Sequence, residues 1–281
     1  MSTESEALNL IKYSLFGGTP PRIAHWDAVV RELKRHAILP LGAVIGLEIP
    51  AEYSEIFTRA YYKNLRRFGL HSRAIRELNG LFARPVILKG IAAAQYYAAP
   101  AKRTIGDIDF ILPGEDFDRA VAVMLENGFV RTEDERRDLS ETKHRAFDKK
   151  GVHYELHRYF SLNISEKNRR LDELIRTALP EAHSAEGCSF FSLPDALNGL
   201  VLLEHITHHL QEEGLGLRQI IDWACFVNVC LTDELWAAAF GALAEECTPS
   251  RLLRRRHRGP CPIPRAGRSH AVGQSLFPLI R

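Results

Sequence analysis

Near its middle the sequence contains the segment Thr104–Leu112 (TIGDIDFIL), in which two aspartates one residue apart interrupt an apolar, β-branched run. On a β-strand, Asp107 and Asp109 would share one face, while the isoleucine and phenylalanine that follow them would point into the core. Two carboxylates this close repel each other unless a cation joins them, and Mg²⁺ takes oxygen ligands of this kind. The pattern favours a metal site on a strand. The alternative is a strand end with two solvated acids.

A second apolar strand is expected upstream, at Pro85–Gly90 (PVILKG), followed by the Ala-rich helix Ile91–Tyr97. A strand that runs through glycine into a helix N-terminus presents backbone N–H groups and a positive dipole end to a phosphate. Gly90 lets the backbone approach closely, and Lys89 can add a point charge. Arg103, just before the aspartate strand, can reach either a phosphate or the first aspartate. The alternative is an ordinary strand-to-helix turn with a surface lysine.

A third carboxylate is expected on the downstream strand Gly151–Phe160 (GVHYELHRYF), whose polar and apolar residues alternate strictly. His153, Glu155 and His157 then share one face. If this strand lies beside the aspartate strand, Glu155 completes a carboxylate cluster of the kind that two-metal sites for phosphoryl and nucleotidyl transfer use. The rival interpretation is a zinc site made of the two histidines and the glutamate. We disfavour it because strand spacing spreads these residues over about 13 Å.

The order of these motifs resembles the nucleotidyltransferase superfamily, which has the polymerase-β-like fold. More narrowly, the chain resembles an uncharacterised bacterial nucleotidyltransferase family whose members carry LKG and R-x-x-G-D-h-D, where h is hydrophobic. The matching segments here are Leu88–Gly90 (LKG) and Arg103–Asp109 (RTIGDID). Similarity continues in His36–Leu41 (HAILPL), Leu202–His209 (LLEHITHH) and Leu217–Trp223 (LRQIIDW), so the resemblance covers roughly residues 20–245.

The resemblance implies metal-dependent transfer of a nucleoside monophosphate from a nucleoside triphosphate (NTP) to an acceptor hydroxyl or phosphate, with release of pyrophosphate. The implied metal ligands and catalytic residues are Asp107, Asp109 and Glu155, binding Mg²⁺, with Mn²⁺ as the alternative ion. Glu155 would also help to deprotonate the acceptor. The implied triphosphate-binding groups are Lys89, the backbone at Gly90, and Arg103.

The acceptor and the partners stay open at this point. The acceptor can be a small molecule, an RNA or a protein, because acceptor pockets in such folds are built from variable helices. One alternative is a toxin-like or RNA-modifying member of the same superfamily, with an antitoxin as partner. Another is a catalytically silent binding or scaffold protein. The argument for it is that Ile91 follows Gly90, where the superfamily usually has a second glycine or a serine that helps to hold the triphosphate.

The composition is that of an ordinary globular protein. The chain has 281 residues, of which 46% are hydrophobic and 26% charged, and its formal net charge of +2 gives no electrostatic case for or against nucleic acid as a partner. No apolar run reaches the roughly 18 residues that span a membrane, and the acidic N-terminus lacks the basic start of a signal peptide. The five cysteines are widely spaced and form no C-x-x-C pair. We therefore expect a cytoplasmic protein with reduced thiols and no membrane partner.

Hydrophobic periodicity predicts a mixed α/β (α+β) fold in four regions. Residues 1–80 form an N-terminal helical region, in which a helix after Pro50 continues through Leu78 and Gly69 is a candidate break. Residues 81–165 form the core, a small mixed sheet that the resemblance implies is of nucleotidyltransferase type. Residues 166–250 form a C-terminal helical region, and residues 251–281 form a basic tail. A strand at Arg145–Phe147 is expected to pair as a hairpin with the strand that carries Glu155.

Two groups in the C-terminal helical region have more than one interpretation. His205, His208 and His209 can form a metal cluster, line the acceptor cleft, or be partly buried core residues, and we favour the last. Arg218 and Asp222 lie four residues apart on a predicted helix. We expect them to form a surface salt bridge.

Residues 251–281 lose the apolar periodicity and contain no acidic residue. A basic tail of this kind can bind nucleic acid. We favour instead an out-of-frame end, which in a GC-rich gene yields Arg, Pro, Gly and Ala at random. In both cases we expect disorder, and a chain that ends near Pro249 should keep its solubility and melting temperature.

Overall fold

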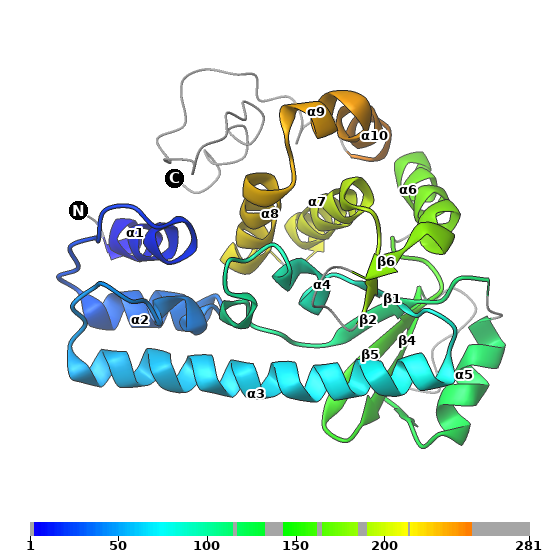
Figure 1. Ribbon diagram of the computed structural model, residues 1–281, viewed down its shortest axis with the longest axis horizontal. Coiled ribbons are helices and arrows are strands. Elements are labelled where there is room, and N and C mark those ends of the chain that lie inside the picture. Colours follow the sequence, from blue (N-terminus) through cyan, green and yellow to red (C-terminus); the bar gives the residue numbers. More distant parts are fainter. Residues whose placement is uncertain are drawn as a thin grey trace.

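The aspartate strand lies at the centre of a mixed sheet in the computed structural model, which describes residues 3–114, 117–132, 143–161, 165–184, 190–212 and 214–248 (Figure 1). Within those residues the strands follow the order β3-β4-β5-β2-β1-β7-β6. Strand β2 is antiparallel to β1 and parallel to β5. The strands are β1 Val86–Leu88, β2 Ile108–Ile111, β3 Val130–Arg131, β4 His144–Lys149, β5 Val152–His157, β6 His183–Ser184 and β7 Phe191–Ser192.

Helices precede, interrupt and follow the sheet. They are α1 Thr3–Phe16, α2 Trp26–Arg35, α3 Ala51–Leu81, α4 Gly90–Ala94, α5 Phe117–Glu126, α6 Glu166–Ala178, α7 Asp195–Glu212, α8 Leu217–Val229, α9 Asp233–Leu235 and α10 Gly241–Cys247. Short segments of other helix type are η1 Leu39–Gly42, η2 Pro100–Lys102, η3 Leu179–Glu181 and η4 Trp236–Phe240. The predicted mixed α/β fold, with helices on both sides of the sheet in sequence, is confirmed.

The predicted hairpin around Glu155 is also confirmed, since β4 pairs antiparallel with β5 along the full length of both strands. The proposed boundaries of the four regions stay a prediction. The basic tail, residues 251–281, lies outside the described residues. Among the described residues no single helix has both the length and the apolar character to cross a membrane. Helix α8 and the segment Asp233–Cys247 meet those criteria only when taken together, and they are bent by 100° at their junction.

The two faces of the sheet pack into different hydrophobic clusters because successive strand residues point to opposite sides. Ile87, Ile108 and Phe110 pack with the second half of α3 and with α5. Val86 and Leu88 belong to the other cluster, which the N-terminal helices share with α6, α7 and α8. Figure 1 shows the sheet between α3 on one side and α7 and α8 on the other. The face of β2 that carries Asp109 is therefore the face toward α7 and α8.

Helix α3 is continuous, so the candidate break at Gly69 is wrong. Gly69 is exposed, and a Cβ atom added there would meet nothing within 4 Å. A single glycine in a helix costs only about 1 kcal/mol relative to alanine. That cost is outweighed here because both ends of the helix are anchored, by buried Phe57 in one hydrophobic cluster and by Ile75 and Leu78 in the other.

A residue in the middle of α3, Asn64, forms hydrogen bonds with the segment that leads into β2. The side chain of Asn64 is buried, and its Nδ2 donates hydrogen bonds to the carbonyl oxygens of Ala101 and Arg103, both at 2.6 Å. Its Oδ1 accepts a hydrogen bond from the backbone N–H of Ile105 at 3.2 Å. These three bonds satisfy backbone groups of the segment from Ala101 to Ile105, which would otherwise be buried without partners. Asn64 thus fixes the position from which the aspartate strand starts.

The turn after β1 is tight, and the helix that follows is shorter than the predicted Ile91–Tyr97. Lys89 and Gly90 both have positive φ, at 45° and 39°. A Cβ atom at Gly90 would lie 3.3 Å from the backbone oxygen of Asp107, closer than ordinary contact. The backbone at Gly90 therefore lies directly against the start of the aspartate strand. Helix α4 has only five residues, which end at Ala94.

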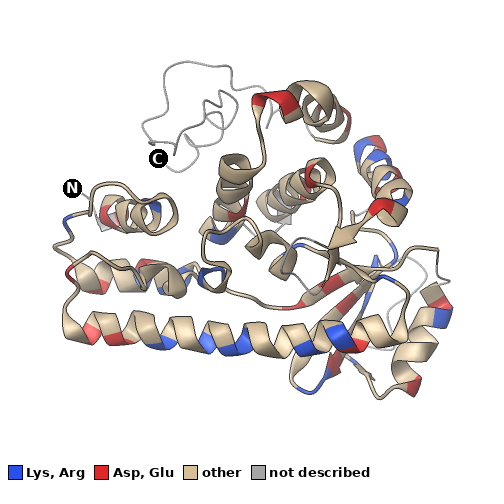
Figure 2. Cartoon of the chain, viewed as in Figure 1, with Lys and Arg blue, Asp and Glu red and all other residues tan. Residues whose placement is uncertain are grey.

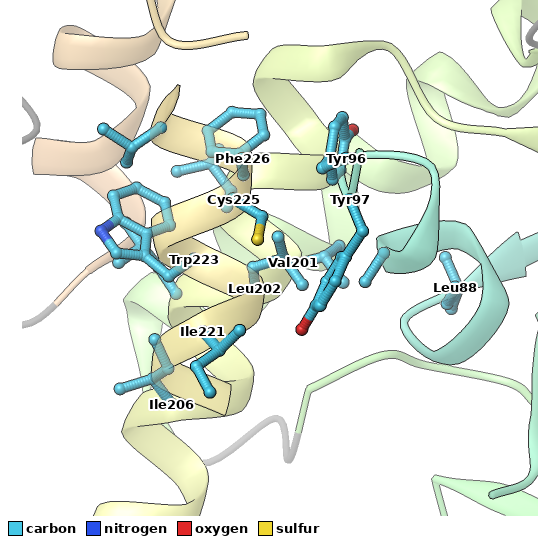
Figure 3. Packing of buried hydrophobic residues seen from close by; sticks show 14 of the residues in the cluster. Leu88, Tyr96, Tyr97, Val201, Leu202, Ile206, Ile221, Trp223, Cys225 and Phe226 are labelled. Atoms are coloured by element: carbon cyan, nitrogen blue, oxygen red, sulfur yellow. The ribbon is translucent and has the colours of Figure 1, made fainter. Parts of the chain in front are cut away.

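Helices α7 and α8 pack against the β1–α4 turn through a mostly apolar interface (Figure 3). Figure 3 shows Tyr96 and Tyr97 directed toward side chains of α7 and α8. The hydroxyl of Tyr97 donates a hydrogen bond to Asp222 Oδ1 at 2.7 Å. Arg103 binds the same carboxylate through Nε, at 2.9 Å from Oδ1, and through Nη2, at 2.7 Å from Oδ2. This buried network ties α8 to the segment that carries the aspartates.

Candidate active site

The strand register brings the three predicted carboxylates together. Asp109 on β2 lies directly opposite Glu155 on the parallel strand β5, and Asp107 precedes β2 on the same face. One carboxylate oxygen from each residue lies within 4.8 Å of the others. Figure 2 shows acidic positions on these neighbouring central strands. The convergence expected from strand phase is therefore present, while the catalytic and metal-binding roles of the three residues stay a prediction.

Asp109 is the most enclosed of the three. Its side chain is 2% exposed, and its Oδ1 lies 2.6 Å from Lys89 Nζ and 3.0 Å from His157 Nε2. Burial acts to raise the pKa of Asp109, but the charge of Lys89 and the hydrogen bond from His157 outweigh it and hold the pKa well below its usual range. Asp109 is thus ionised, with two cationic neighbours.

His157 was not predicted as a partner of Asp109. Its Nδ1 faces the carbonyl oxygen of Tyr159 at 3.1 Å while its Nε2 faces Asp109, so both ring nitrogens meet acceptors and both carry a proton. Burial acts to lower the pKa of His157, but hydrogen bonds to Asp109 and Glu155 outweigh it and the pKa is raised. The available signal was the alternation of its strand, which places His157 on the face of Glu155.

Asp107 lies where burial and a neighbouring carboxylate both disfavour its ionised form. Burial raises its pKa, and the charge of Asp109 raises it further, while Lys89 acts in the opposite direction. Lys89 and His157 are the cationic partners of Asp109, and Lys143 also lines the cavity. An all-oxygen donor set with ligand atoms this close suits a hard divalent cation. The residues present therefore fit a magnesium or manganese ion.

The predicted zinc alternative is only partly matched. His153 does not join the cluster, because its Nδ1 lies 2.7 Å from Asp148 Oδ1 on the neighbouring strand. His144 on β4 takes its place, and its ring nitrogen lies within 4.8 Å of ligand atoms from Glu155 and His157. His157 is bound to Asp109, however, and its raised pKa opposes the neutral imidazole that zinc requires.

The three predicted triphosphate-binding residues differ in their surroundings. Lys89 and Gly90 line the cavity in front of the carboxylates, and the Lys89 ammonium is paired with Asp109. Arg103 lines the same cavity, but its side chain is 4% exposed and two of its nitrogens are bound to Asp222. The guanidinium of Arg103 therefore already has a buried carboxylate partner, and its role in holding the triphosphate stays a prediction. The expected surface salt bridge between Arg218 and Asp222 is wrong, since Asp222 is buried and bound to Arg103.

A cavity of about 710 Å³ opens in front of the carboxylates, within the range of about 300 to 1,000 Å³ typical of ligand pockets. Its sheet wall holds the carboxylates with Lys89 and His144, and its helix wall comes from α7 and α8. The helix-wall residues are Glu204, His205, His208, His209 and Arg218. The three histidines therefore line the cleft, which is one of the alternatives given above. The favoured interpretation, that they are partly buried core residues, does not describe this placement. Burial lowers the pKa of His205 well below its usual range, so this histidine is neutral.

Comparison with known proteins agrees with this geometry. A family model described as uncharacterised nucleotidyltransferase matches residues 23–255, which include both walls of the cavity. A search of curated proteins found no match to the chain. The extent of the family match, together with three clustered carboxylates on the central strands, shows that this chain belongs to that nucleotidyltransferase family.

Proposed function

We propose that the protein transfers a nucleoside monophosphate from an NTP to an acceptor and uses Asp107, Asp109 and Glu155 to hold divalent metal. The observation that carries the proposal is the close approach of these three carboxylates at the floor of a cavity. The metal is Mg²⁺, or Mn²⁺ as the alternative. When bound in such a site it stabilises the negative charge that develops on the attacking and leaving oxygens.

Residues of the chain would accept the proton of the acceptor and contact the phosphates. Glu155, the least buried of the carboxylates on its strand pair, accepts the proton of the acceptor hydroxyl. The acceptor oxygen then bonds to the α-phosphorus, and the bond from that phosphorus to the bridging oxygen breaks to release pyrophosphate. Lys89 and the backbone at Gly90 lie beside the carboxylates and would contact the phosphates. Before substrate enters, the ammonium of Lys89 balances the charge of Asp109.

The acceptor remains a proposal at the level of class: a small molecule, an RNA or a protein. The helix wall, with neutral His205 and the other histidines, offers hydrogen-bond donors and acceptors to such a group. The toxin-like alternative, with an antitoxin partner, uses the same site. In the scaffold alternative the cavity binds a ligand but catalyses no reaction. The presence of Ile91 after Gly90, in place of a second glycine or a serine, supports this alternative.

The test is a transfer assay with each of the four NTPs, labelled at the α-phosphorus, in the presence of Mg²⁺ or Mn²⁺. Candidate acceptors are total tRNA, a pool of small hydroxyl-bearing molecules and the protein itself. We expect label on one acceptor class and equimolar pyrophosphate. Glu155→Gln should lose both, whereas Glu173→Gln, which changes an exposed carboxylate outside the cavity, should retain them. NTP binding without transfer to any acceptor would favour the scaffold alternative, and absence of NTP binding would refute the proposal.

A further inference from the structure

The two walls of the cavity differ in charge. The sheet wall carries the three carboxylates. The helix wall carries one carboxyl group, that of Glu204, together with histidines and Arg218. Burial raises the pKa of Glu204 to about 7, so near neutral pH this group is about half protonated. The permanent charge on the helix wall is therefore the guanidinium of Arg218.

Arg218 is a partly buried cation without an ion pair among the described residues. The carboxylate one helical turn along, Asp222, would be its usual partner on a helix. Both oxygens of Asp222 are already occupied, by Arg103 and by the hydroxyl of Tyr97. Two other cations that line the cavity are paired with carboxylates, Lys89 with Asp109 and Arg103 with Asp222. Arg218 differs from them in this respect.

This arrangement has a free-energy cost that an anion can remove. Burial lowers the pKa of Arg218, and the neighbouring charge of Arg103 lowers it further, only partly offset by Asp222 and Asp107. A charge taken from water without a partner costs stability. A phosphate that enters the cavity would neutralise it, and the planar guanidinium can bind two phosphate oxygens at once.

We infer that Arg218 binds the polyphosphate chain of the nucleotide, in the place that the sequence motif gives to Arg103. The inference rests on the proposed function, because that function supplies the polyphosphate. Arg218 shares the cavity with the metal-binding carboxylates but comes from the opposite wall. The phosphates would then lie between the carboxylates on the sheet and the guanidinium on α8.

The test compares Arg218→Gln and Arg218→Lys with the wild-type full chain, and uses Arg103→Gln as the matched control. Two ligands are titrated calorimetrically with Mg²⁺ present: each NTP, and inorganic tripolyphosphate, which has the phosphate chain without a nucleoside. We expect Arg218→Gln to weaken both by at least about tenfold, which is about 1.4 kcal/mol. Arg218→Lys keeps the positive charge but loses the planar guanidinium that can bind two phosphate oxygens at once. Its affinity for both ligands should therefore lie between those of wild type and Arg218→Gln.

Thermal unfolding of the ligand-free proteins separates binding from a structural role. Arg218→Gln removes an unpaired charge and should melt at or above the wild-type temperature, whereas Arg103→Gln leaves Asp222 buried without its cation and should melt well below it. If Arg218→Gln melts as low as Arg103→Gln or fails to fold, Arg218 is structural and the inference is wrong. Wild-type affinity for tripolyphosphate in Arg218→Gln also overturns it.

The outcomes for the wild type keep the two proposals distinct. If the wild type binds NTP and Arg218→Gln binds it equally well, the nucleotidyltransferase proposal stands and the Arg218 inference fails. If the wild type binds tripolyphosphate through Arg218 but no NTP, Arg218 is a phosphate-binding residue as inferred, but its ligand is not a nucleotide and the nucleotidyltransferase proposal fails. If the wild type binds neither ligand, both proposals fail.

Discussion

Asp109→Asn should destabilise the metal-free protein, whereas Asp107→Asn should not. From the sequence alone, Asp109→Asn is expected to relieve the repulsion between Asp107 and Asp109 and to leave stability without metal equal or slightly higher. The structure changes this expectation for Asp109, whose carboxylate is the partner of the buried Lys89 ammonium and of His157. Within the part of the chain that the structure describes, Asp107 forms no such ion pair, and its pKa is raised by burial and by the charge of Asp109.

The size of the effect follows from the burial of the pair. The side chains of Lys89 and Asp109 are 13% and 2% exposed. Removing one partner of a buried ion pair costs about 3 to 5 kcal/mol. Asparagine retains an oxygen that can accept from Lys89, so we expect the lower end, about 3 kcal/mol. For a domain of this size that corresponds to a melting temperature roughly 6 to 12 °C lower. Asp107→Asn should melt at or slightly above the wild-type temperature.

The assay is thermal and urea unfolding in EDTA, followed by circular dichroism, with metal titration of the same samples. Both variants should lose affinity for Mg²⁺ and Mn²⁺, because each removes a charged ligand. The stability measurements then separate them, since the loss of metal affinity is shared and the loss of stability is not. Equal stability of Asp109→Asn and wild type, or an equal loss in both variants, would refute the ion-pair argument.

Three further predictions concern residues around the site. Glu204 has its pKa raised from 4.5 to about 7 in the folded protein, so its contribution to stability is present at low pH and is lost as the pH rises through that window. Allowing for partial exposure, this amounts to about 2 kcal/mol. Glu204→Gln should therefore gain stability relative to wild type as the pH rises, and a pH-independent difference in urea unfolding would contradict it. Asp222→Asn should lower stability by about 3 to 5 kcal/mol, since it leaves Arg103 buried without a counter-charge, and a change below about 1 kcal/mol in urea unfolding would show the pair to be dispensable. Asn64→Ala removes three buried hydrogen bonds and should cost about 2 to 4 kcal/mol in the same measurement, whereas a neutral effect would mean that water satisfies the segment before β2.

The sequence was sufficient to predict the carboxylate site because strand alternation is a local rule. The two-residue period places Asp107 and Asp109 on one face, and a parallel neighbour then brings Glu155 opposite. The partners of the buried cations were not predictable in this way. Arg103 meets Asp222 across 119 positions of sequence, and the choice depends on how α8 docks. Local spacing favoured Arg218 for that role, and tertiary packing overrode it.

The candidate break at Gly69 failed for a related reason. Intrinsic propensity penalises glycine within a helix, but the penalty is small beside the burial of Phe57 and Ile75 on either side of it. The role of His157 required knowledge of the register between β2 and β5, which hydrophobic alternation alone does not give.

The continuity of α3 also determines how the molecule should unfold. Its first half contributes Phe57 to one hydrophobic cluster and its second half contributes Ile75 and Leu78 to the other. Unfolding either cluster would expose half of α3 and would break the hydrogen bonds between Asn64 and the segment that leads into β2. The two clusters should therefore lose structure in a single cooperative transition. In native-state hydrogen exchange, the amides of central α3 and of β2 should open with the same, global free energy.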